Sequence, residues 1–356
     1  MANQEKNTAN SVNRRKFLGR GAAAGAVLAG SGSLSGGDAS AASAKHAAPY
    51  NERTHKVMPT RNFGKTGYQV GIYSLGGQAK LEIDGTEEES VAIVERAIDL
   101  GINYIDTAAA YGGGVSERHI GKVMKHRRNE VFLATKTNDM SYDGSMRLLD
   151  KSLKQLQTDH LDTWQIHNVK TMEQLDRAFA NDGALKAIEK ARDEGIVRFV
   201  GITGHYEPLV LAEALNRYDF ASILMAINAA DTHYLSFKRY LLPLAQQKQV
   251  GIVGMKLASR GRLLSTWKPP ADDKQREYMR TQKPGAVTMK ESLYYNFSLP
   301  ISTNIVGVDT IKQLEENVKS ASEFTPLDDD QLASLEYKTL PVVRQGLYFR
   351  RWNMGV

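Results

Sequence analysis

The feature that most constrains the fold of this chain is an alternation of strand-like and helix-like segments, repeated eight times after residue 60. Short runs rich in β-branched and aromatic residues are each followed by apolar residues at helical spacing. The predicted strands span residues 70–75, 103–106, 131–136, 161–167, 198–203, 222–227, 251–255 and 304–307. The predicted helices lie near residues 87–100, 116–125, 144–156, 183–194, 207–216, 236–247, 288–297 and 310–321. Eight such units predict a parallel (β/α)8 TIM barrel in a single domain.

An open doubly wound sheet is the alternative fold for an alternating pattern. That fold would place a phosphate-binding loop after the first strand, and Gly76-Gly77 is a poor match to one. We therefore expect a barrel over residues 58–325, preceded by a linker at 45–57 and followed by a C-terminal helix and tail at 326–356. Residues 265–287 are predicted to form a charged insertion after the seventh strand.

The first 44 residues have the pattern of an export signal rather than of a folded segment. Arg14 and Arg15 form a twin-arginine pair before Phe17-Leu18, and an Ala- and Gly-rich stretch and two small-x-small sites follow. The apolar stretch is too short to span a bilayer, which needs about 20 residues. The segment resembles twin-arginine (Tat) signals. This predicts contact with the Tat export machinery, a periplasmic location and no stable membrane insertion, with a basic disordered tail as the alternative.

Composition excludes several classes of function. The chain has no cysteine, which rules out thiolate nucleophiles, disulfides and cysteine-ligated metal centres. Its formal net charge is +6, and half of that excess lies within residues 1–44. The remaining surplus is too small to predict a nucleic-acid-binding surface. Oligomeric state leaves no signal in this sequence.

Four polar residues stand at or just after the ends of neighbouring predicted strands, where TIM barrels carry their active sites. Asp106 ends the second strand and Tyr111 follows it, whereas Lys136 and His167 end the third and fourth. Each alone has an ordinary structural explanation. A lysine that ends an apolar strand needs a partner, however, because burying an unpaired ammonium is costly, and Asp106 is the obvious carboxylate.

This set of groups is suited to proton delivery. A phenol has a pKa of about 10, and a cation about 4 Å away contributes about 4 kcal/mol at an effective dielectric of 20. One lysine would then bring the pKa of Tyr111 near 7. Tyr111 would act as general acid in reduction and as base in oxidation, while His167 would orient a carbonyl oxygen. The hydride must come from a cofactor, because no side chain supplies one.

The same residues resemble the aldo-keto reductase family over about residues 58–325. The resemblance rests on GINYIDTAAAYG at 101–112 with Ser116-Glu117 and Gly121, on Arg61-Phe63-Gly64-Thr66-Gly67, on Ala134-Thr135-Lys136 and on Gln165-Ile166-His167. It implies that Asp106, Tyr111, Lys136 and His167 are the catalytic tetrad. It also implies a nicotinamide cofactor that lies extended across the C-terminal rim of the barrel.

The resemblance also implies a set of cofactor contacts. For the nicotinamide and pyrophosphate they are Thr203, Asn228, Met255, Lys256, Gly261 and Arg262. For the adenosine end they are Gly307, Gln313, Glu316 and Asn317. Gly204 lacks the side-chain amide that family members usually place after the fifth strand, and Gly307 and Gln313 stand where basic residues usually bind the 2′-phosphate. NADP is the family default, and NAD is a serious rival.

The substrate is expected to be a small carbonyl or alcohol compound, an aldehyde, a ketone or a sugar. Trp164 and Tyr206 are candidates for the pocket wall, together with the tail aromatics Tyr348, Phe349 and Trp352. Arg350-Arg351 could meet an acidic substrate but is expected to be a solvated end. A cofactor-binding sensor or partner subunit on the same barrel is the alternative function. A metal-dependent hydrolase or isomerase is less favoured, because only Asp106 and His167 could serve it as ligands at the strand ends.

Overall fold

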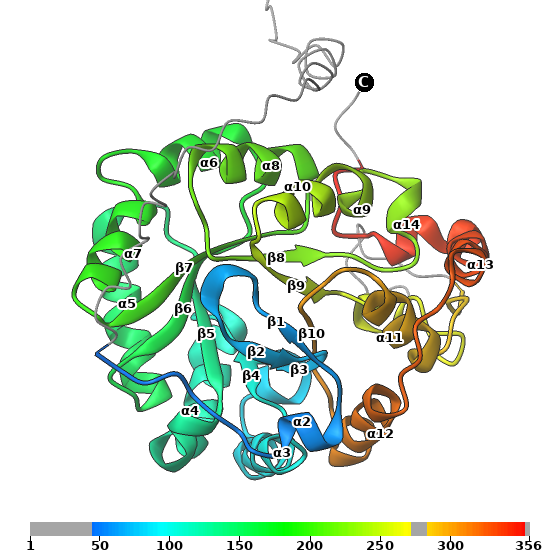
Figure 1. The fold of residues 1–356 in the computed structure, drawn as a ribbon, viewed down its shortest axis with the longest axis horizontal. Coiled ribbons are helices and arrows are strands. Elements are labelled where there is room, and N and C mark those ends of the chain that lie inside the picture. Colours follow the sequence, from blue (N-terminus) through cyan, green and yellow to red (C-terminus); the bar gives the residue numbers. More distant parts are fainter. Residues whose placement is uncertain (1–44, 272–282, 353–356) are drawn as a thin grey trace, which may run out of the picture. The chain divides into compact units, whose positions relative to one another are not determined.

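The computed structural model describes residues 45–271 and 283–352, and eight parallel strands close into a barrel at its centre (Figure 1). The order around the barrel is β10-β3-β4-β5-β6-β7-β8-β9. The strands are β3 (Tyr73–Gly76), β4 (Tyr104–Asp106), β5 (Phe132–Thr137), β6 (Leu161–Ile166), β7 (Val197–Gly204), β8 (Ser222–Ala226), β9 (Gly251–Met255) and β10 (Thr303–Val306). Because β10 pairs with β3, the sheet has no open edge. The predicted (β/α)8 barrel is confirmed, and the open sheet is excluded.

Helices surround the barrel on its outer side (Figure 1). The main ones are α3 (Glu87–Asp99), α4 (Val115–Arg127), α5 (Tyr142–Leu156), α6 (Met172–Phe179), α7 (Ala184–Asp193), α8 (Pro208–Arg217), α9 (Phe237–Tyr240), α10 (Leu242–Gln247), α11 (Met289–Ser298) and α12 (Ile311–Ser322). The sequence pattern did not predict α6, and the single helix predicted over 236–247 is divided at Leu241. The helix is divided there because Pro243 is the second residue of α10, and a proline is accepted in the first turn of a helix but not in its interior.

A two-stranded hairpin closes the N-terminal end of the barrel. It consists of β1 (Thr60–Asn62) and β2 (Gln69–Gly71), which pair antiparallel. Phe63 is buried and meets Tyr104 and Phe132 edge-on at centroid distances of 5.6 and 5.3 Å. The strand predicted over residues 70–75 is therefore two strands, because the chain leaves the hairpin at Ile72 before it enters the barrel as β3.

Residues 45–57, which we call the N-terminal strap, do not form the plain linker that the sequence predicts. They include the short helix α2 (Thr54–Val57) and are held against the barrel by specific contacts. The Tyr50 amide donates to the Asn129 carbonyl at 2.8 Å, and the buried Asn51 side chain donates to the Ile98 carbonyl at 2.8 Å. Buried backbone and amide groups need such partners, and these contacts fix the course of the strap.

The C-terminal region consists of α13 (Asp329–Thr339), a 3₁₀ turn at Leu340–Val342, the short α14 (Val343–Gly346) and an irregular tail. Arg350 in this tail is fully buried, which corrects the expectation of a solvated end. Its guanidinium pairs with the Asp231 carboxylate, donates to the Ala226 carbonyl at 2.8 Å and lies 3.9 Å from the centre of the Phe237 ring. The tail is therefore a packed part of the fold.

Two sequence predictions concern residues that the structure does not describe. The export signal at 1–44 lies outside the described residues, and the insertion predicted at 265–287 lies partly outside them. Within the described part of the chain, no helix is both long and apolar enough to cross a membrane.

Candidate active site

The C-terminal ends of β4, β5 and β6 bring three of the predicted catalytic residues together. The strands are parallel neighbours, and their register places Asp106 beside Ala134 and Lys136 beside Gln165. Successive side chains of a strand point to opposite faces, so Asp106, Lys136 and Gln165 point into the barrel at one level. Gln165, which the sequence analysis did not single out, donates from Nε2 to Asp106 Oδ2 at 3.0 Å.

Lys136 is fully buried and forms an ion pair with the equally buried Asp106. Its Nζ donates to Asp106 Oδ1 and, at 2.5 Å, to the carbonyl oxygen of Thr107. Burial alone would lower the pKa of Lys136, but the charge of Asp106 and the hydrogen bonds of Lys136 to Asp106 and Tyr111 outweigh it and the net pKa is raised. Lys136 is therefore a fixed positive charge, as the sequence predicts for a lysine that has a carboxylate partner.

Tyr111 begins a 3₁₀ turn (Tyr111–Gly114) directly above this ion pair. Gly112, Gly113 and Gly114 follow it with positive φ angles of 57°, 66° and 101°, conformations that favour glycine. This tight turn directs the phenol back over the barrel. The Tyr111 hydroxyl accepts from Lys136 Nζ at 3.4 Å, and Nζ lies 4.8 Å from the ring centre.

The sequence analysis predicted a lowered pKa for Tyr111, and the structure shows the opposite direction. Burial raises the pKa of the Tyr111 phenol above its ordinary value of 10; the Lys136 ammonium opposes this shift without reversing it, and the Asp106 carboxylate adds to it. The estimate from a single cation at 4 Å omitted the desolvation of the phenolate and the carboxylate that already neutralises Lys136. Tyr111 is therefore protonated at neutral pH.

His167 follows β6 and completes the group at the mouth of the barrel. Its ring meets the Tyr111 ring edge-on, with centroids 5.8 Å apart. Burial and the charges of Lys136, Lys256 and Lys170 lower the pKa of His167 from 6.5 to about 3. The imidazole is thus neutral at physiological pH and can donate one hydrogen bond. The structure brings together all four residues of the predicted tetrad.

Comparison with known proteins decides the family of this barrel. The model of the aldo/keto reductase family matches residues 69–339, which is most of the chain and includes all four residues. The chain belongs to the aldo/keto reductase family. As a member of this family, it is an NAD(P)-dependent oxidoreductase.

Several relatives of this aldo/keto reductase cover most of its length. An L-galactose dehydrogenase of Arabidopsis thaliana is 30% identical over 76% of this chain and 90% of its own. An uncharacterized oxidoreductase of Bacillus subtilis is 27% identical over 79% of this chain and 97% of its own. Among solved structures, the holo form of an aldo-keto reductase from Bacillus halodurans matches with a TM-score of 0.64 and 26% identity. That match covers 79% of this chain and 96% of the other.

The residues expected at the nicotinamide end of this aldo/keto reductase lie around the barrel mouth, but two of them already have protein partners. Thr203 is buried, and its hydroxyl accepts from the Asn168 amide at 2.7 Å. The Asn228 side-chain amide donates to three oxygen atoms, Lys256 O at 3.1 Å, Ser259 Oγ at 3.1 Å and Gly346 O at 3.3 Å. Met255 is buried in the inner apolar cluster of the barrel.

The residues expected near the pyrophosphate follow β9. Lys256 donates to Gln78 Oε1 at 2.8 Å, which links the ends of β9 and β3. Burial and the Arg260 guanidinium lower the pKa of Lys256 from 10.5 to about 7. The Arg262 guanidinium stacks on Tyr348 at 4.6 Å from the ring centre, and Gly261 has a φ of 89° beside Trp267, which leaves no room for a Cβ.

The adenosine-end candidates follow β10. Asn317 is buried and donates to the Tyr73 hydroxyl at 3.2 Å, whereas Glu316 is exposed and lies 4.0 Å from the Lys312 ammonium. Gln313 accepts from the Asp309 amide at 2.8 Å, and a Cβ on Gly307 would come within 2.8 Å of Gln78 O. At the 2′-phosphate positions themselves, Gly307 and Gln313, neither side chain carries a positive charge.

The structure corrects one of the two expected substrate residues. Trp164 is fully buried in the outer apolar cluster between barrel and helices, because its neighbours Thr163 and Gln165 take the inward positions on β6. It therefore does not reach the mouth of the barrel. Tyr206 is partly buried in the loop after β7 and remains a candidate for the wall of the substrate pocket.

Sequence reasoning did not single out His205 and Asn168 at the mouth of the barrel. His205 Nδ1 lies 2.9 Å from Asn168 Oδ1, and the pKa of His205 is well below its ordinary value because of burial and the charge of Lys256. Its ring lies 6.0 Å from that of Phe349 in the tail, which was among the expected pocket aromatics. The sequence placed His205 beside Gly204, but only the fold brings it close to Asn168 and Phe349.

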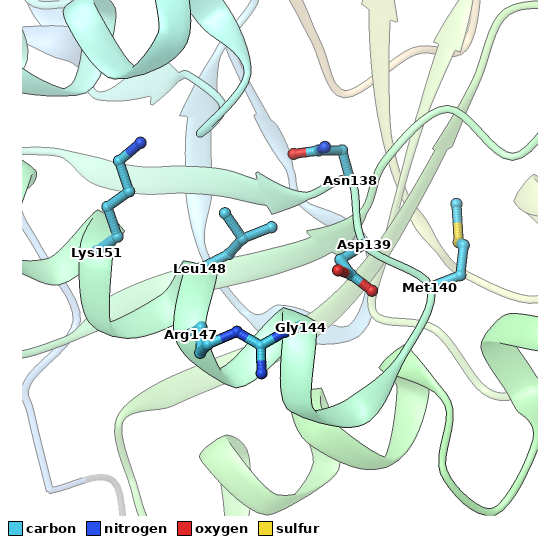
Figure 2. A pocket seen from close by; sticks show the side chains of 7 residues that line it. All are labelled: Asn138, Asp139, Met140, Gly144, Arg147, Leu148 and Lys151. Carbon is cyan, nitrogen blue, oxygen red and sulfur yellow. The ribbon is translucent and has the colours of Figure 1, made fainter.

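A separate hollow lies beside the beginning of α5. Its volume is about 510 Å³. Figure 2 shows the residues that line it, which are Asn138, Asp139, Met140, Gly144, Arg147, Leu148 and Lys151. None of the tetrad residues lines it. Asp139 is held by the Ser141 amide at 2.8 Å and so serves the start of α5. The candidate active site is the mouth of the barrel, not this hollow.

Proposed function

We propose that this enzyme interconverts a carbonyl compound and an alcohol, with Tyr111 as the proton donor and acceptor. The observation that carries the proposal is the chain of contacts from Asp106 through Lys136 to Tyr111, in which a buried cation lies 3.4 Å from a phenolic oxygen. Tyr111 is partly buried, so its hydroxyl can meet a small molecule from above. A positioned phenol beside a fixed cation is suited to proton transfer.

Each residue of the group has a distinct task in this mechanism. Because its pKa is raised, Tyr111 carries a proton at neutral pH and donates it to the carbonyl oxygen during reduction. Lys136 stabilises the phenolate that remains, and Asp106 keeps Lys136 charged and in place. His167 is neutral and offers an N–H to the same carbonyl oxygen, which fixes its direction.

The residues at the barrel mouth fit a nicotinamide dinucleotide, which supplies or accepts the hydride when bound. Lys256 and Arg262 provide positive charge for a pyrophosphate, and Met255 provides an apolar surface for a ring. NADP is our proposal for the cofactor, because it is the family default and an aldo-keto reductase from Klebsiella pneumoniae is described in complex with NADPH.

NAD is the alternative cofactor. The positions expected to bind the 2′-phosphate, Gly307 and Gln313, carry no charge; the exposed Lys312 lies one residue before Gln313, and a lysine lacks the two-pronged geometry with which arginine binds phosphate. Titration of both nucleotides against the purified enzyme decides between them. NAD binding at least tenfold tighter than NADP binding would overturn our choice.

The experiment that tests the reaction is a screen of aldehydes, ketones and sugars by nicotinamide absorbance. Sugars belong in the screen because the Arabidopsis relative is an L-galactose dehydrogenase. We expect turnover that Tyr111→Phe removes while cofactor binding stays intact. Cofactor binding without turnover of any compound, unchanged by Tyr111→Phe, would favour the alternative function of a sensor or partner subunit.

For localisation, we propose export by the twin-arginine route to the periplasm. The proposal rests on Arg14-Arg15 and the small-residue sites that follow. Since that route carries folded proteins, the nucleotide would be bound before export. Replacement of both arginines by lysine should keep the protein in the cytoplasm, and periplasmic protein should release nucleotide on denaturation. Equal periplasmic amounts of both forms would contradict the route.

A further inference from the structure

A group of three metal-ligating side chains lies at the end of the barrel opposite the candidate active site. It consists of His46 in the N-terminal strap and of Asp159 and His160, which directly precede β6. One ligand atom from each residue lies within 4.8 Å of the others. His160 and His167 flank the six residues of β6, so these two histidines are about 23 Å apart along the strand at a rise of about 3.3 Å per residue.

We propose that His46, Asp159 and His160 bind one Zn²⁺ ion, which ties the N-terminal strap to the barrel. Two imidazole nitrogens and a carboxylate oxygen form a donor set that zinc accepts, with a water molecule in the fourth position. Magnesium and calcium prefer sites made of oxygen alone. This site belongs to none of the family features described above, and it does not depend on the proposed reaction.

The two imidazoles lie against each other, and because an imidazole nitrogen binds a metal in the plane of its ring, one ring must turn out of this stack for both to reach one ion. Their rings are stacked, with centroids 3.8 Å apart and an interplanar angle of 5°. Ligand atoms around a tetrahedral zinc lie roughly 3.3 Å apart, given zinc–ligand distances of about 2.0–2.2 Å. The most widely separated pair of ligand atoms would therefore approach by about 1.5 Å at most, and Asp159 Oδ1 already lies 2.7 Å from His160 Nδ1. Asp159 has a side chain that is 80% exposed, so it can rotate toward an ion without disturbing the core.

The backbone around His160 is fixed before any ion binds. Its carbonyl oxygen accepts from Thr158 Oγ1 at 3.1 Å and from Arg128 Nη2 at 3.3 Å. The Arg128 guanidinium is itself held by Asp162 at 2.8 Å, a carboxylate that also pairs with Arg198 at 2.7 Å. Ligands held by such outer contacts lose little conformational freedom when a metal binds.

The N-terminal strap is held on both sides of His46. Lys45 lies over Gly195, where a Cβ would come within 3.3 Å of the Lys45 Cβ, and the Tyr50 amide bonds to the Asn129 carbonyl. Two chain segments more than 110 positions apart in sequence therefore present imidazole and carboxylate donors to one point.

The test is zinc titration of the full-length protein after treatment with a chelator, by calorimetry and by thermal unfolding. We expect one Zn²⁺ per chain and a rise in Tm with zinc but not with magnesium, since a ligand that binds only the folded state stabilises it. His46→Gln and Asp159→Asn should each weaken zinc binding at least tenfold and reduce the rise in Tm.

His55→Gln is the matched control, because His55 lies in the same strap, is exposed, and bonds to Thr60 rather than to the cluster. This variant should bind zinc like the unaltered protein. Zinc affinity that is the same in all four proteins, or a rise in Tm that survives both His46→Gln and Asp159→Asn, would overturn the proposal. Because the site is remote from the tetrad, the variants should keep their oxidoreductase activity.

Discussion

The Lys136 ammonium lies 3.4 Å from the Tyr111 hydroxyl oxygen, although 25 positions separate the two residues in the sequence. Two strands and a glycine-rich turn create this contact, and Asp106 holds the ammonium from the other side. The contact allows a partly buried phenol to give up a proton while a neighbouring cation stabilises the phenolate that remains. The proposed chemistry depends on it.

Tyr111→Phe removes the proton donor and leaves the ring in place. We expect kcat to fall by about 10²–10⁴-fold, the usual contribution of general acid–base catalysis. Cofactor affinity should change little, because the hydroxyl faces Lys136 and the mouth. Steady-state kinetics and nucleotide titration check this prediction. Unchanged kcat would show that another group donates the proton.

Asp106→Asn leaves Lys136 buried without its carboxylate. Breaking a buried ion pair in this way typically costs about 3–5 kcal/mol, so the free energy of unfolding should fall by that order. The double variant Asp106→Asn/Lys136→Met removes the uncompensated charge and should recover much of that loss without recovering activity. Denaturant unfolding combined with activity assays separates the two effects. Full activity in the double variant would refute the role of the ion pair.

The pH dependence of cofactor binding should follow Lys256. Its pKa in the folded protein is about 7, so its positive charge is lost as the pH rises through 7. A dinucleotide pyrophosphate prefers the charged form, and the dissociation constant should therefore rise with pH above 7. Lys256→Met should bind more weakly at pH 6 and show a flatter profile, whereas Lys122→Met on α4 should behave like the unaltered protein. Parallel profiles for all three proteins would contradict the assignment.

Lys256 also makes the free energy of unfolding depend on pH. Its pKa is near 10.5 in the unfolded chain and about 7 in the folded one, so the unfolded chain binds more protons between these values. Lys256 therefore makes the folded protein more stable as the pH rises from 7 toward 10. Lys256→Met should remove this increase, which denaturant unfolding at several pH values would measure.

Arg350→Met should loosen the C-terminal tail. The variant lacks the ion pair between residue 350 and Asp231, but Asp231 still accepts hydrogen bonds from Ser236 Oγ at 2.7 Å and from the Lys238 amide at 2.9 Å. We therefore expect a loss near the lower end of the about 3–5 kcal/mol range for a broken buried pair. Because Arg350 also donates to the His205 carbonyl, KM for the substrate should rise more than kcat falls. Arg351→Met, at a partly exposed neighbour, is the control and should have little effect.

Much of the fold followed from the sequence, because a barrel of this kind is built from local units. Each unit carries its own strand propensity and helical spacing, and the chain order alone places Asp106, Lys136 and His167 at the C-terminal ends of adjacent strands. The predicted ends of β9 agree with the structure, and those of β4 to β8 differ by one residue at most. The grouping of Asp106, Lys136 and His167 could be predicted for the same reason, since strand ends are a local property of the sequence, whereas the catalytic role of the tetrad stays a prediction that rests on the family resemblance.

Other features depended on which atoms the fold brings together. Barrel strands are buried on both faces, so their apolar runs do not show which side points inward; only the bond from Gln165 to Asp106 shows that Trp164 points outward. The raised pKa of Tyr111 depends on the desolvation of the assembled site, and the burial of Arg350 depends on an Asp231 located 119 positions away. Periodicity and propensity are properties of neighbouring residues, whereas burial and long-range pairing exist only after the chain has closed into its barrel.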